Sequence, residues 1–386
     1  MKKILLLILF SFMLLNLQAQ QNDFKSSNTQ FMIRGFGDVG FNSFNINGEK
    51  NSTFNAGGFS PIFLFKQSDR LMFESELELS QSAGSLDIGL EYADVMYVLN
   101  DYMTVRAGKF LVPFGTFMER LHPSWVNRMP TKPLGFGHDG IAPMSGVGVE
   151  LRGAFRVGAS TMNYSFYTTN GPTLKTPDGV EPMESGMLMF ENLKDNNNNR
   201  AFGSRIGLLP FSDSSTEIGF SYYSTSKIGT KGTVFENLGA KLFAFDFSFV
   251  KQIPIIGGIV DVKSQYAKSK IDNITYTVEE TPGVFEDLIF NNINSSYYGQ
   301  LSYRPSMFEN NFVKNLELVG RFSKLETPVG SGFATNKKEF SIGLNYWLTW
   351  HSLIKLNYQN ITGEGGHDVV GKFNEKAFFI NWAIGF

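Results

Sequence analysis

Most of the chain alternates between apolar and polar residues with a period of two, the pattern of a β-strand with two different faces. The clearest case is 71–81, where apolar residues share one face and acidic residues the other: Leu71, Phe73, Leu77 and Leu79 against Glu74, Glu76 and Glu78. A helix would scatter these side chains around its circumference. The same alternation predicts about sixteen strands, at 30–41, 54–66, 71–81, 86–99, 102–112, 145–155, 159–168, 201–210, 216–226, 238–250, 258–268, 296–304, 313–325, 338–348, 353–361 and 375–386.

The connections between these strands alternate between short and long. Short turns are expected at 67–70, 100–101, 211–215 and 349–352, and long loops at 113–144, 169–200, 269–295 and 362–374. Barrels of the outer membrane have short periplasmic turns and longer external loops, and about 9–11 residues cross a bilayer as a tilted strand. The strand lengths and the loop lengths therefore both favour a barrel that crosses a membrane.

Composition supports the same interpretation. Aromatic residues make up 15% of the chain and charged residues 18%, whereas charged residues are about 25% of an average protein. A closed barrel of about sixteen strands is too wide for side chains to fill, so a lipid-facing apolar surface and a wet, charged lumen suit it better than a dry core. Closure gives every backbone N–H and C=O at membrane depth a partner. We expect an all-β fold, a transmembrane antiparallel β-barrel of the bacterial outer membrane, with the lipid bilayer as its partner.

The first residues have the features of a targeting signal. Lys2 and Lys3 precede an apolar stretch from Ile4 to Leu15, and Ala19 offers a small residue at a cleavage site. We expect a signal peptide at 1–19 and a single outer-membrane barrel domain at 20–386. No later stretch approaches the length of a membrane-spanning helix.

An apolar face toward lipid makes the opposite face the lining of the lumen. Charged residues of both signs fall on that face: Arg34, Arg106, Arg152, Arg205, Arg321, Glu74, Glu76 and Glu78. Rings of charge set ion selectivity in a pore. The alternative is that these charges only solvate a wide channel.

The segment from Pro113 to Met144 is the best candidate for a constriction. It holds four prolines between 113 and 133, together with Trp125 and several phenylalanines. A solvated external loop does not need so many apolar residues, so we expect this third external loop to fold back into the lumen. The alternative is that it caps the barrel or packs at a subunit contact.

Five basic residues at or near this loop are expected to narrow and charge the pore: Lys109, Arg120, His122, Arg128 and Lys132. Lys109 falls on the apolar face of its strand. It is expected either at the rim of the barrel or turned inward by a bulge near Gly108.

A short motif resembles a known family. Gly108-Lys109-Phe110 followed by Pro113-Phe114-Gly115 is similar to the phosphate-selective porin O and P family, and the continuation Glu119-Arg120-Leu121-His122-Pro123 resembles its relatives in Bacteroidetes-type bacteria. The resemblance implies a sixteen-stranded channel, commonly trimeric, with the third loop inside as the constriction. It also implies a preference for anions that rests on inward arginines. The row of Glu74, Glu76 and Glu78 and the net charge of −2 depart from that pattern.

Several kinds of chemistry are not expected. The chain has no cysteine, which excludes disulfides and thiolate chemistry, and no metal-ligand spacing or nucleotide loop appears. The net charge of −2 argues against nucleic-acid binding. An outer-membrane hydrolase would need a nucleophile and a base, but the four histidines fall in loops and a turn: His122, His138, His351 and His367.

We therefore expect no catalytic residues, no metal and no cofactor. The predicted function is an outer-membrane porin for passive diffusion of small hydrophilic solutes or ions. A preference for anions such as phosphate and assembly as a homotrimer are what the resemblance implies. The alternatives are a plugged structural or adhesive barrel and an outer-membrane hydrolase.

Overall fold

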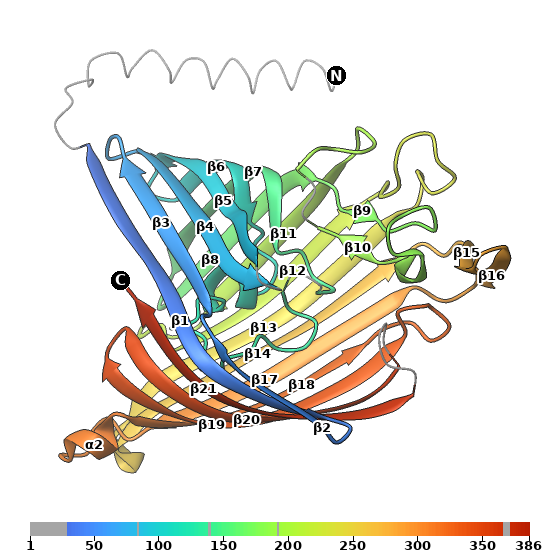
Figure 1. The fold of residues 1–386 in the computed structure, drawn as a ribbon. Helices are drawn as coiled ribbons and strands as arrows, with labels where there is room; N and C mark the ends of the chain where they lie inside the picture. The colour runs from blue at the N-terminus through green and yellow to red at the C-terminus, as the bar shows by residue number, and fades with distance from the viewer. Residues whose placement is uncertain (1–28, 83–84, 138–139, 191–192, 366–370) are drawn as a thin grey trace, which may run out of the picture.

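The computed structural model describes residues 29–82, 85–137, 140–190, 193–365 and 371–386, and most of their strands belong to one antiparallel sheet that closes on itself (Figure 1). The signal peptide expected at 1–19 lies outside the described residues. The strands of the sheet are β1 (Gln30–Ile46), β2 (Glu49–Asn55), β3 (Gly58–Lys66), β4 (Leu71–Ser82), β5 (Ser85–Asn100), β6 (Met103–Leu111), β7 (Ser145–Val157), β8 (Ser160–Asn170), β11 (Arg200–Leu209), β12 (Thr216–Thr225), β13 (Ala240–Ile253), β14 (Gly258–Ile271), β17 (Ile293–Arg304), β18 (Leu316–Glu326), β19 (Thr335–Thr349), β20 (Ser352–Gly365) and β21 (Lys372–Gly385).

β1 closes the barrel. It pairs with β21 along Phe36–Ile46, with β2 along Gly40–Ile46 and with β3 along Gln30–Gly37. Because β2 and β3 follow one another along the same side of β1, they are two halves of one strand. The 17 strands of the sheet in the described part of the chain therefore make a closed barrel of sixteen, and the prediction of the fold is confirmed.

A glycine allows the break between β2 and β3. Gly57 has a φ of +65°, a left-handed conformation that glycine adopts without penalty. A Cβ at this position would lie 1.9 Å from the carbonyl oxygen of Asp38 on β1. The chain can therefore turn here without leaving the wall.

Smaller elements lie in the connections between barrel strands. They are β9 (Thr173–Leu174) with β10 (Leu188–Met189), β15 (Tyr276–Thr281) with β16 (Val284–Leu288), and the short helices η2 (Phe117–Leu121), η3 (Pro182–Glu184), η4 (Pro254–Ile256) and α2 (Asn311–Lys314). α2 begins at Asn310, whose side chain accepts hydrogen bonds from the backbone N–H groups of the next turn. Within the described residues, the helices are all too short to cross a bilayer.

The two faces of the wall differ as the alternation predicts. Phe245 is 52% exposed and Phe378 42% on the outside of the barrel, whereas the inward Glu339 and Ser341 are 0% exposed. Polar side chains such as these are buried because they face the lumen, where they pack against each other or against loops. The apolar side chains thus face outward, where a bilayer surrounds them.

The strands are longer than predicted, mainly at the end of the barrel that carries the long loops. The strand predicted at 338–348 runs from Thr335 to Thr349, and the one predicted at 353–361 runs from Ser352 to Gly365. The hydrogen-bonded ladder continues past the apolar band, where both faces of a strand are polar and alternation no longer marks it. This end of the wall extends beyond the bilayer.

Candidate functional site

The loop between β6 and β7, residues 112–144, forms hydrogen bonds with inward-facing side chains of the barrel wall. At its start, the N–H of Gly115 donates to Ser221 Oγ on β12 at 3.0 Å. The N–H of Thr116 donates to Gln265 Oε1 on β14 at 2.9 Å. These contacts join the loop to strands that are not neighbours of β6 in the sheet.

The later part of the loop is held by three further strands. Arg321 Nη1 on β18 donates to the carbonyl oxygen of Thr131 at 2.7 Å, Asn345 Nδ2 on β19 donates to that of Arg128 at 3.0 Å, and Lys355 Nζ on β20 donates to that of Ser124 at 2.5 Å. The inward polar residues of β12 to β20 are thus used to satisfy loop backbone groups, which would otherwise be buried without partners.

Apolar packing also holds the loop. Phe117 and Phe136 of the loop contact Tyr298 on β17, with ring centroids 5.6 and 5.4 Å away. These rings belong to a larger buried apolar cluster that includes residues of other loops, among them Phe290 and Phe333. The apolar residues that distinguish this loop in sequence are therefore packed and not solvated.

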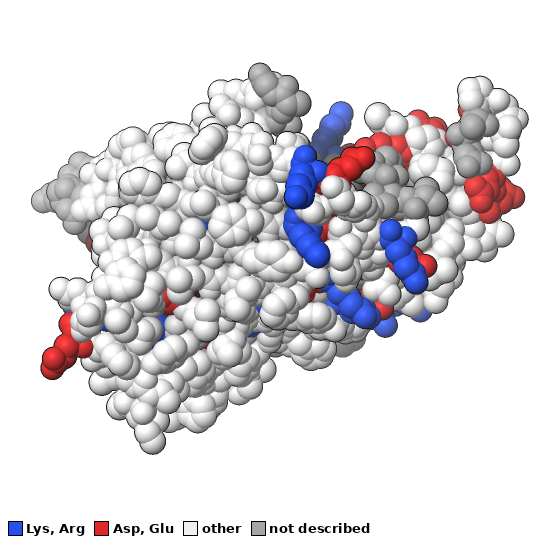
Figure 2. All heavy atoms as spheres, turned by 60° about the horizontal axis from the view of Figure 1, so that its bottom comes forward, with Lys and Arg blue, Asp and Glu red and all other residues white. Residues whose placement is uncertain are grey.

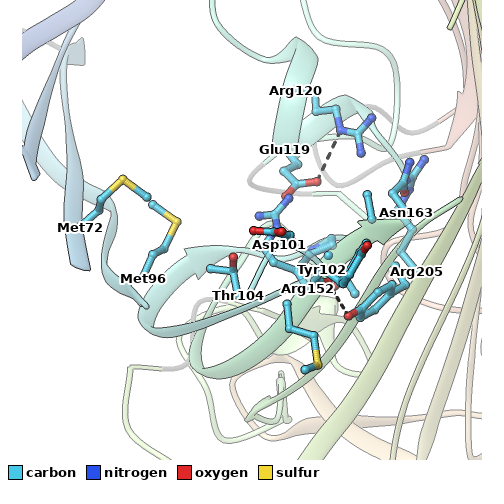
Figure 3. A pocket seen from close by; sticks show the side chains of 16 residues that line it. Met72, Met96, Asp101, Tyr102, Thr104, Glu119, Arg120, Arg152, Asn163 and Arg205 are labelled. Carbon is cyan, nitrogen blue, oxygen red and sulfur yellow. Dashed lines mark hydrogen bonds and ion pairs between the residues drawn. The ribbon is translucent and has the colours of Figure 1, made fainter. Parts of the chain in front are cut away.

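The loop leaves space beside the wall of β3 to β8 (Figure 3). One opening there has a volume of about 460 Å³ and reaches the turn at Asp101 and Tyr102. A second opening of about 350 Å³ is lined by Ile62, Glu74, Glu76 and Tyr92. The two openings share Glu119, Arg120 and Arg152. We call the two together the passage.

Glu119, on the short helix η2 of the loop, is the centre of the charges in the passage. Its carboxylate lies 2.9 Å from Arg152, 3.7 Å from Arg120 and 3.9 Å from Arg106. Burial alone would raise the pKa of Glu119, but the guanidinium groups of Arg152, Arg120 and Arg106 outweigh it and hold that pKa below its usual range. Glu119 therefore stays ionised at neutral pH.

Arg106 and Arg205 are buried ion-pair partners of the wall. Arg106 Nε lies 2.6 Å from Glu150, and Arg205 Nη2 lies 2.6 Å from Asp246. Their side chains are 6% and 2% exposed. Guanidinium groups so enclosed neutralise wall carboxylates and offer little surface to a solute.

Arg120 and Arg152 are far more accessible. Their side chains are 38% and 33% exposed. Arg120 Nη1 also lies 2.8 Å from Glu217 on β12, so it spans the gap between loop and wall. These two guanidinium groups are the cations that a solute in the passage would meet.

His122 borders the second opening. Its Nδ1 is within hydrogen-bond distance of the carbonyl oxygen of Met118, at 2.5 Å, and its Nε2 is 3.8 Å from Glu76. Its ring meets Phe36 edge-on at 6.0 Å. Of the predicted acidic row, Glu74 and Glu76 line the passage, and Glu78 continues the row on the same face of β4.

The expectation that Lys109 narrows the pore is wrong. Lys109 pairs with Ala93 and Val147 on the outward face of β6, and its Nζ donates to the carbonyl oxygen of Leu90. Gly108 has a φ of +135°, but the alternation of the strand is kept there, so no bulge turns Lys109 inward.

The other predicted residues lie outside the two openings. Arg128 pairs with Glu317 at 3.1 Å and stacks on Trp347, which places it between the loop and the wall. Lys132 accepts a hydrogen bond from Arg321 through its carbonyl oxygen.

Two of the predicted arginine rungs also lie apart from the passage. Arg321 is 1% exposed and paired with Glu339. Arg34 is exposed near the start of β1. The five inward arginines therefore do not form one continuous ladder of accessible charge.

Sequence reasoning missed several residues of the site. Tyr92 borders the passage because β5 has a bulge opposite Glu76 and Leu77 that changes which residues face inward. Asp94 and Lys355 are buried charges of the inner wall. Strand parity could have indicated Lys355, whereas Asp94 lies beyond the bulge with Tyr92, and nothing in the pattern marks the bulge.

Among the residues that the structure describes, no His, Asp and Glu side chains gather as a metal-binding group. Two of the histidines considered for a hydrolase, His138 and His367, lie outside the described residues. His351 is in the β19–β20 turn with its ring 4.5 Å from that of Trp350.

Comparison with known proteins gives likeness in structure alone. No family model matches the chain, and no curated protein matches it in sequence. An anion-selective porin from Comamonas acidovorans is 12% identical with a TM-score of 0.56, covering 92% of this chain and 100% of that one. The outer membrane channel DcaP of Acinetobacter baumannii is 12% identical with a TM-score of 0.58, covering 94% and 99%.

A third structure is the trimer form of OmpT, an outer membrane protein of Vibrio cholerae. It is 10% identical with a TM-score of 0.51, covering 92% of this chain and 99% of that one. At such identities the likeness establishes the fold, which agrees with the closed wall and its outward apolar face. The chain is a transmembrane β-barrel of the bacterial outer membrane.

Proposed function

We propose that the protein is a porin that lets small hydrophilic solutes diffuse passively down their gradients. One observation carries this proposal: the third loop is fixed along the wall from β12 to β20 and leaves a charged passage along β3 to β8. A wet passage lined by ionised groups suits polar solutes and excludes lipids. The solved structures described as a porin and as a channel have the same fold.

The narrower part of the proposal is a preference for anions, phosphate among them. The side chains of Arg120 and Arg152 are 38% and 33% exposed, whereas those of Glu76 and Glu119 are 3% and 10% exposed. The exposed carboxylate of the lining, Asp101, lies in the β5–β6 turn, away from Arg120 on the loop. A planar guanidinium donates two parallel hydrogen bonds to phosphate or carboxylate oxygens. A reversal potential that shows cation preference in the wild-type channel would contradict the proposed anion preference and leave the porin proposal intact.

We also propose that residues 1–19 are a signal peptide, that 20–386 form one barrel domain, and that the barrel assembles as a homotrimer. The trimer is supported by the trimer form described for OmpT. Chemical cross-linking of the protein in native membranes would show a three-copy species if this is correct.

A plugged barrel is the second candidate. It is favoured by the buried apolar cluster, in which residues of four connections pack together: Phe117, Ile228, Phe290 and Phe333. If this cluster sealed the barrel over its whole width, no solute would cross. The enzyme alternative is not favoured by the solved structures described as a porin and as a channel.

Planar lipid bilayers separate these candidates. Purified refolded protein is expected to add stepwise, ohmic conductance, and protein unfolded by boiling should add none. Absence of steps from a correctly folded barrel would establish the plugged barrel in place of the porin.

A further inference from the structure

Lysines gather on the outside of the barrel at the end that carries the long loops. Figure 2 shows blue side chains in a row between the white wall and that end. Six lysines at this end face outward on five strands and define what we call the lysine belt: Lys241, Lys268, Lys270, Lys324, Lys338 and Lys376.

Strand pairing places the belt lysines beside one another. Lys241 on β13 is the direct partner of Lys270 on β14, and Lys324 on β18 is the direct partner of Lys338 on β19. Like charges directly opposite in a sheet destabilise each other. An anionic partner outside the protein would remove this cost.

The protein itself supplies few such anions. On the outward face of the wall strands β13, β14 and β17 to β21 at this end, the acidic residues of the described chain are Glu326 and Glu364, and Glu326 pairs with Lys324 at 2.6 Å. Asp272 directly follows β14 and accepts a hydrogen bond from the N–H of Gly239. The chain as a whole is acidic, with a net charge of −2. The belt is therefore a local excess of positive charge on a chain whose net charge is negative.

The opposite end of the same strands differs. The outward lysine there is Lys251 of β13, which pairs with Asp213 of the neighbouring turn at 3.0 Å. Solubility would call for charge at both ends of a barrel. An excess of lysines at one end of the barrel therefore indicates a ligand that occurs on one side of the membrane.

The belt lies at the polar edge of the apolar band. Lys268 is the direct partner of Phe243, and Lys324 that of Tyr297, both outward aromatic residues. Outward aromatic residues mark the interface between hydrocarbon and headgroups in such barrels. The ammonium groups are thus at the depth of lipid headgroups, on the side that the long loops assign to the cell exterior.

We propose that the lysine belt binds the phosphate groups of glycolipids in the outer leaflet of the outer membrane. The belt faces away from the lumen, so this role is independent of the solute that crosses the passage. Clustered lysines near a membrane surface attract anionic headgroups by about 1 kcal/mol per residue. Several ammonium groups along neighbouring strands would hold a fixed shell of lipid around this part of the barrel.

Native mass spectrometry of the full barrel in neutral detergent can test this. The probes are bisphosphorylated lipid A and the same glycolipid after removal of its phosphates. The wild type is expected to retain the phosphorylated form at least about tenfold better. Equal retention of the two forms would overturn the proposal.

A matched pair of variants locates the binding. The belt variant carries K241Q, K270Q, K338Q and K376Q, and the control carries K194Q, K231Q, K251Q and K314Q, which removes the same number of charges elsewhere on the surface. The belt variant should lose most of the difference between the two lipids, and the control should keep it. The same loss in both variants, or in neither, would contradict a belt site.

Two further measurements keep the test decisive. Raising the salt concentration with the wild type should release phosphorylated lipid A and leave the dephosphorylated form bound, which needs no variant to fold. Channel conductance of the belt variant in a neutral bilayer should equal that of the wild type. Failure of the lipid proposal would then leave the porin proposal intact, and failure of the porin proposal would leave the lipid proposal intact.

Discussion

Arg321 on β18 and Thr131 of the third loop are 190 positions apart in the chain, yet the guanidinium Nη1 donates to the Thr131 carbonyl oxygen at 2.7 Å. The same guanidinium reaches Thr131 Oγ1 at 2.6 Å and Glu339 at 2.6 Å. One buried side chain therefore fixes both a strand pair and the loop.

Replacing Arg321 with methionine should free the later part of the loop. Glu339 would also lose its buried partner, which costs about 3–5 kcal/mol. We expect larger and noisier single-channel conductance in planar bilayers, from channels that still migrate as folded barrels. Arg321→Lys keeps the charge without the two-pronged geometry, so its conductance should lie between those of the wild type and Arg321→Met. Wild-type conductance from folded Arg321→Met would show that this contact does not hold the loop.

Gly115 lies where the loop first contacts β12 and β14. Its φ is +69°, and a Cβ there would lie 2.0 Å from Gln265 Nε2. Gly115→Ala should therefore push the loop off β14 in addition to the backbone strain of about 1–2 kcal/mol. Limited proteolysis of the folded barrel should cut within 113–144 faster than in the wild type.

Gly232 provides the control for that substitution. Its φ of +85° imposes similar strain, but nothing lies within 4 Å of a Cβ there. Gly232→Ala should leave the cleavage of 113–144 unchanged. Equal cleavage in the two variants would mean that the close approach to Gln265 is unimportant.

Arg120→Ala should shift the reversal potential under a salt gradient toward cations. A unit charge acting through water-like surroundings at a separation of about 7 Å contributes roughly 0.6 kcal/mol, or about threefold in the permeability ratio. Arg128→Ala should shift it less, because Arg128 is enclosed by Glu317 and Trp347. An unchanged potential in Arg120→Ala would remove this residue from the ion path.

The ionisation of Glu119 should tie pore selectivity to pH. Its pKa is below the usual range, so its ion pairs stabilise the fold above the ordinary glutamate pKa, and that contribution is lost as pH falls through the lowered value. At neutral pH, Glu119→Gln should shift the reversal potential toward anions.

As the pH is lowered, the reversal potential of the wild type should approach that of Glu119→Gln only below about pH 4.5. A midpoint near neutrality would contradict the lowered pKa. Measurements from pH 3 to 7 on both proteins would settle this.

The closed ladder between β1 and β21 should make migration on gels sensitive to heat. Unboiled protein in detergent is expected to migrate as a more compact species than boiled protein, because the hydrogen bonds of a closed barrel resist detergent at room temperature. Identical migration before and after boiling would count against closure through Phe36–Ile46.

The wall of this barrel was predictable from sequence because lipid imposes a strict alternation on every strand that crosses it. In strands such as β21 the predicted faces are correct, since Phe378 and Ile380 face lipid and Phe379 and Asn381 do not. The ends of β19 and β20 were not predictable, because their ladders continue where neither face meets lipid. The bulge in β5 that turns Tyr92 inward also leaves no mark in the pattern.

The site was predictable only in part. Apolar residues such as Phe117 correctly indicated a packed loop, and the charges of Glu76 and Arg152 follow from strand parity. Which arginines are accessible depends on pairing between distant residues, such as Arg205 with Asp246. A linear sequence shows the charges but not their partners, so Arg321 and Arg120 look equivalent before folding.

Different strands around the barrel hold the loop and border the passage. Strands β12 to β20 grip the loop, and strands β3 to β8 border the route left open. Substitutions on β3 to β8 can therefore change what crosses while the contacts from β12 to β20 still hold the loop, provided that they spare Arg106 and Arg152, which pair with Glu119 of the loop. An arrangement of this kind lets one scaffold diversify its cargo while its narrowest point keeps its shape.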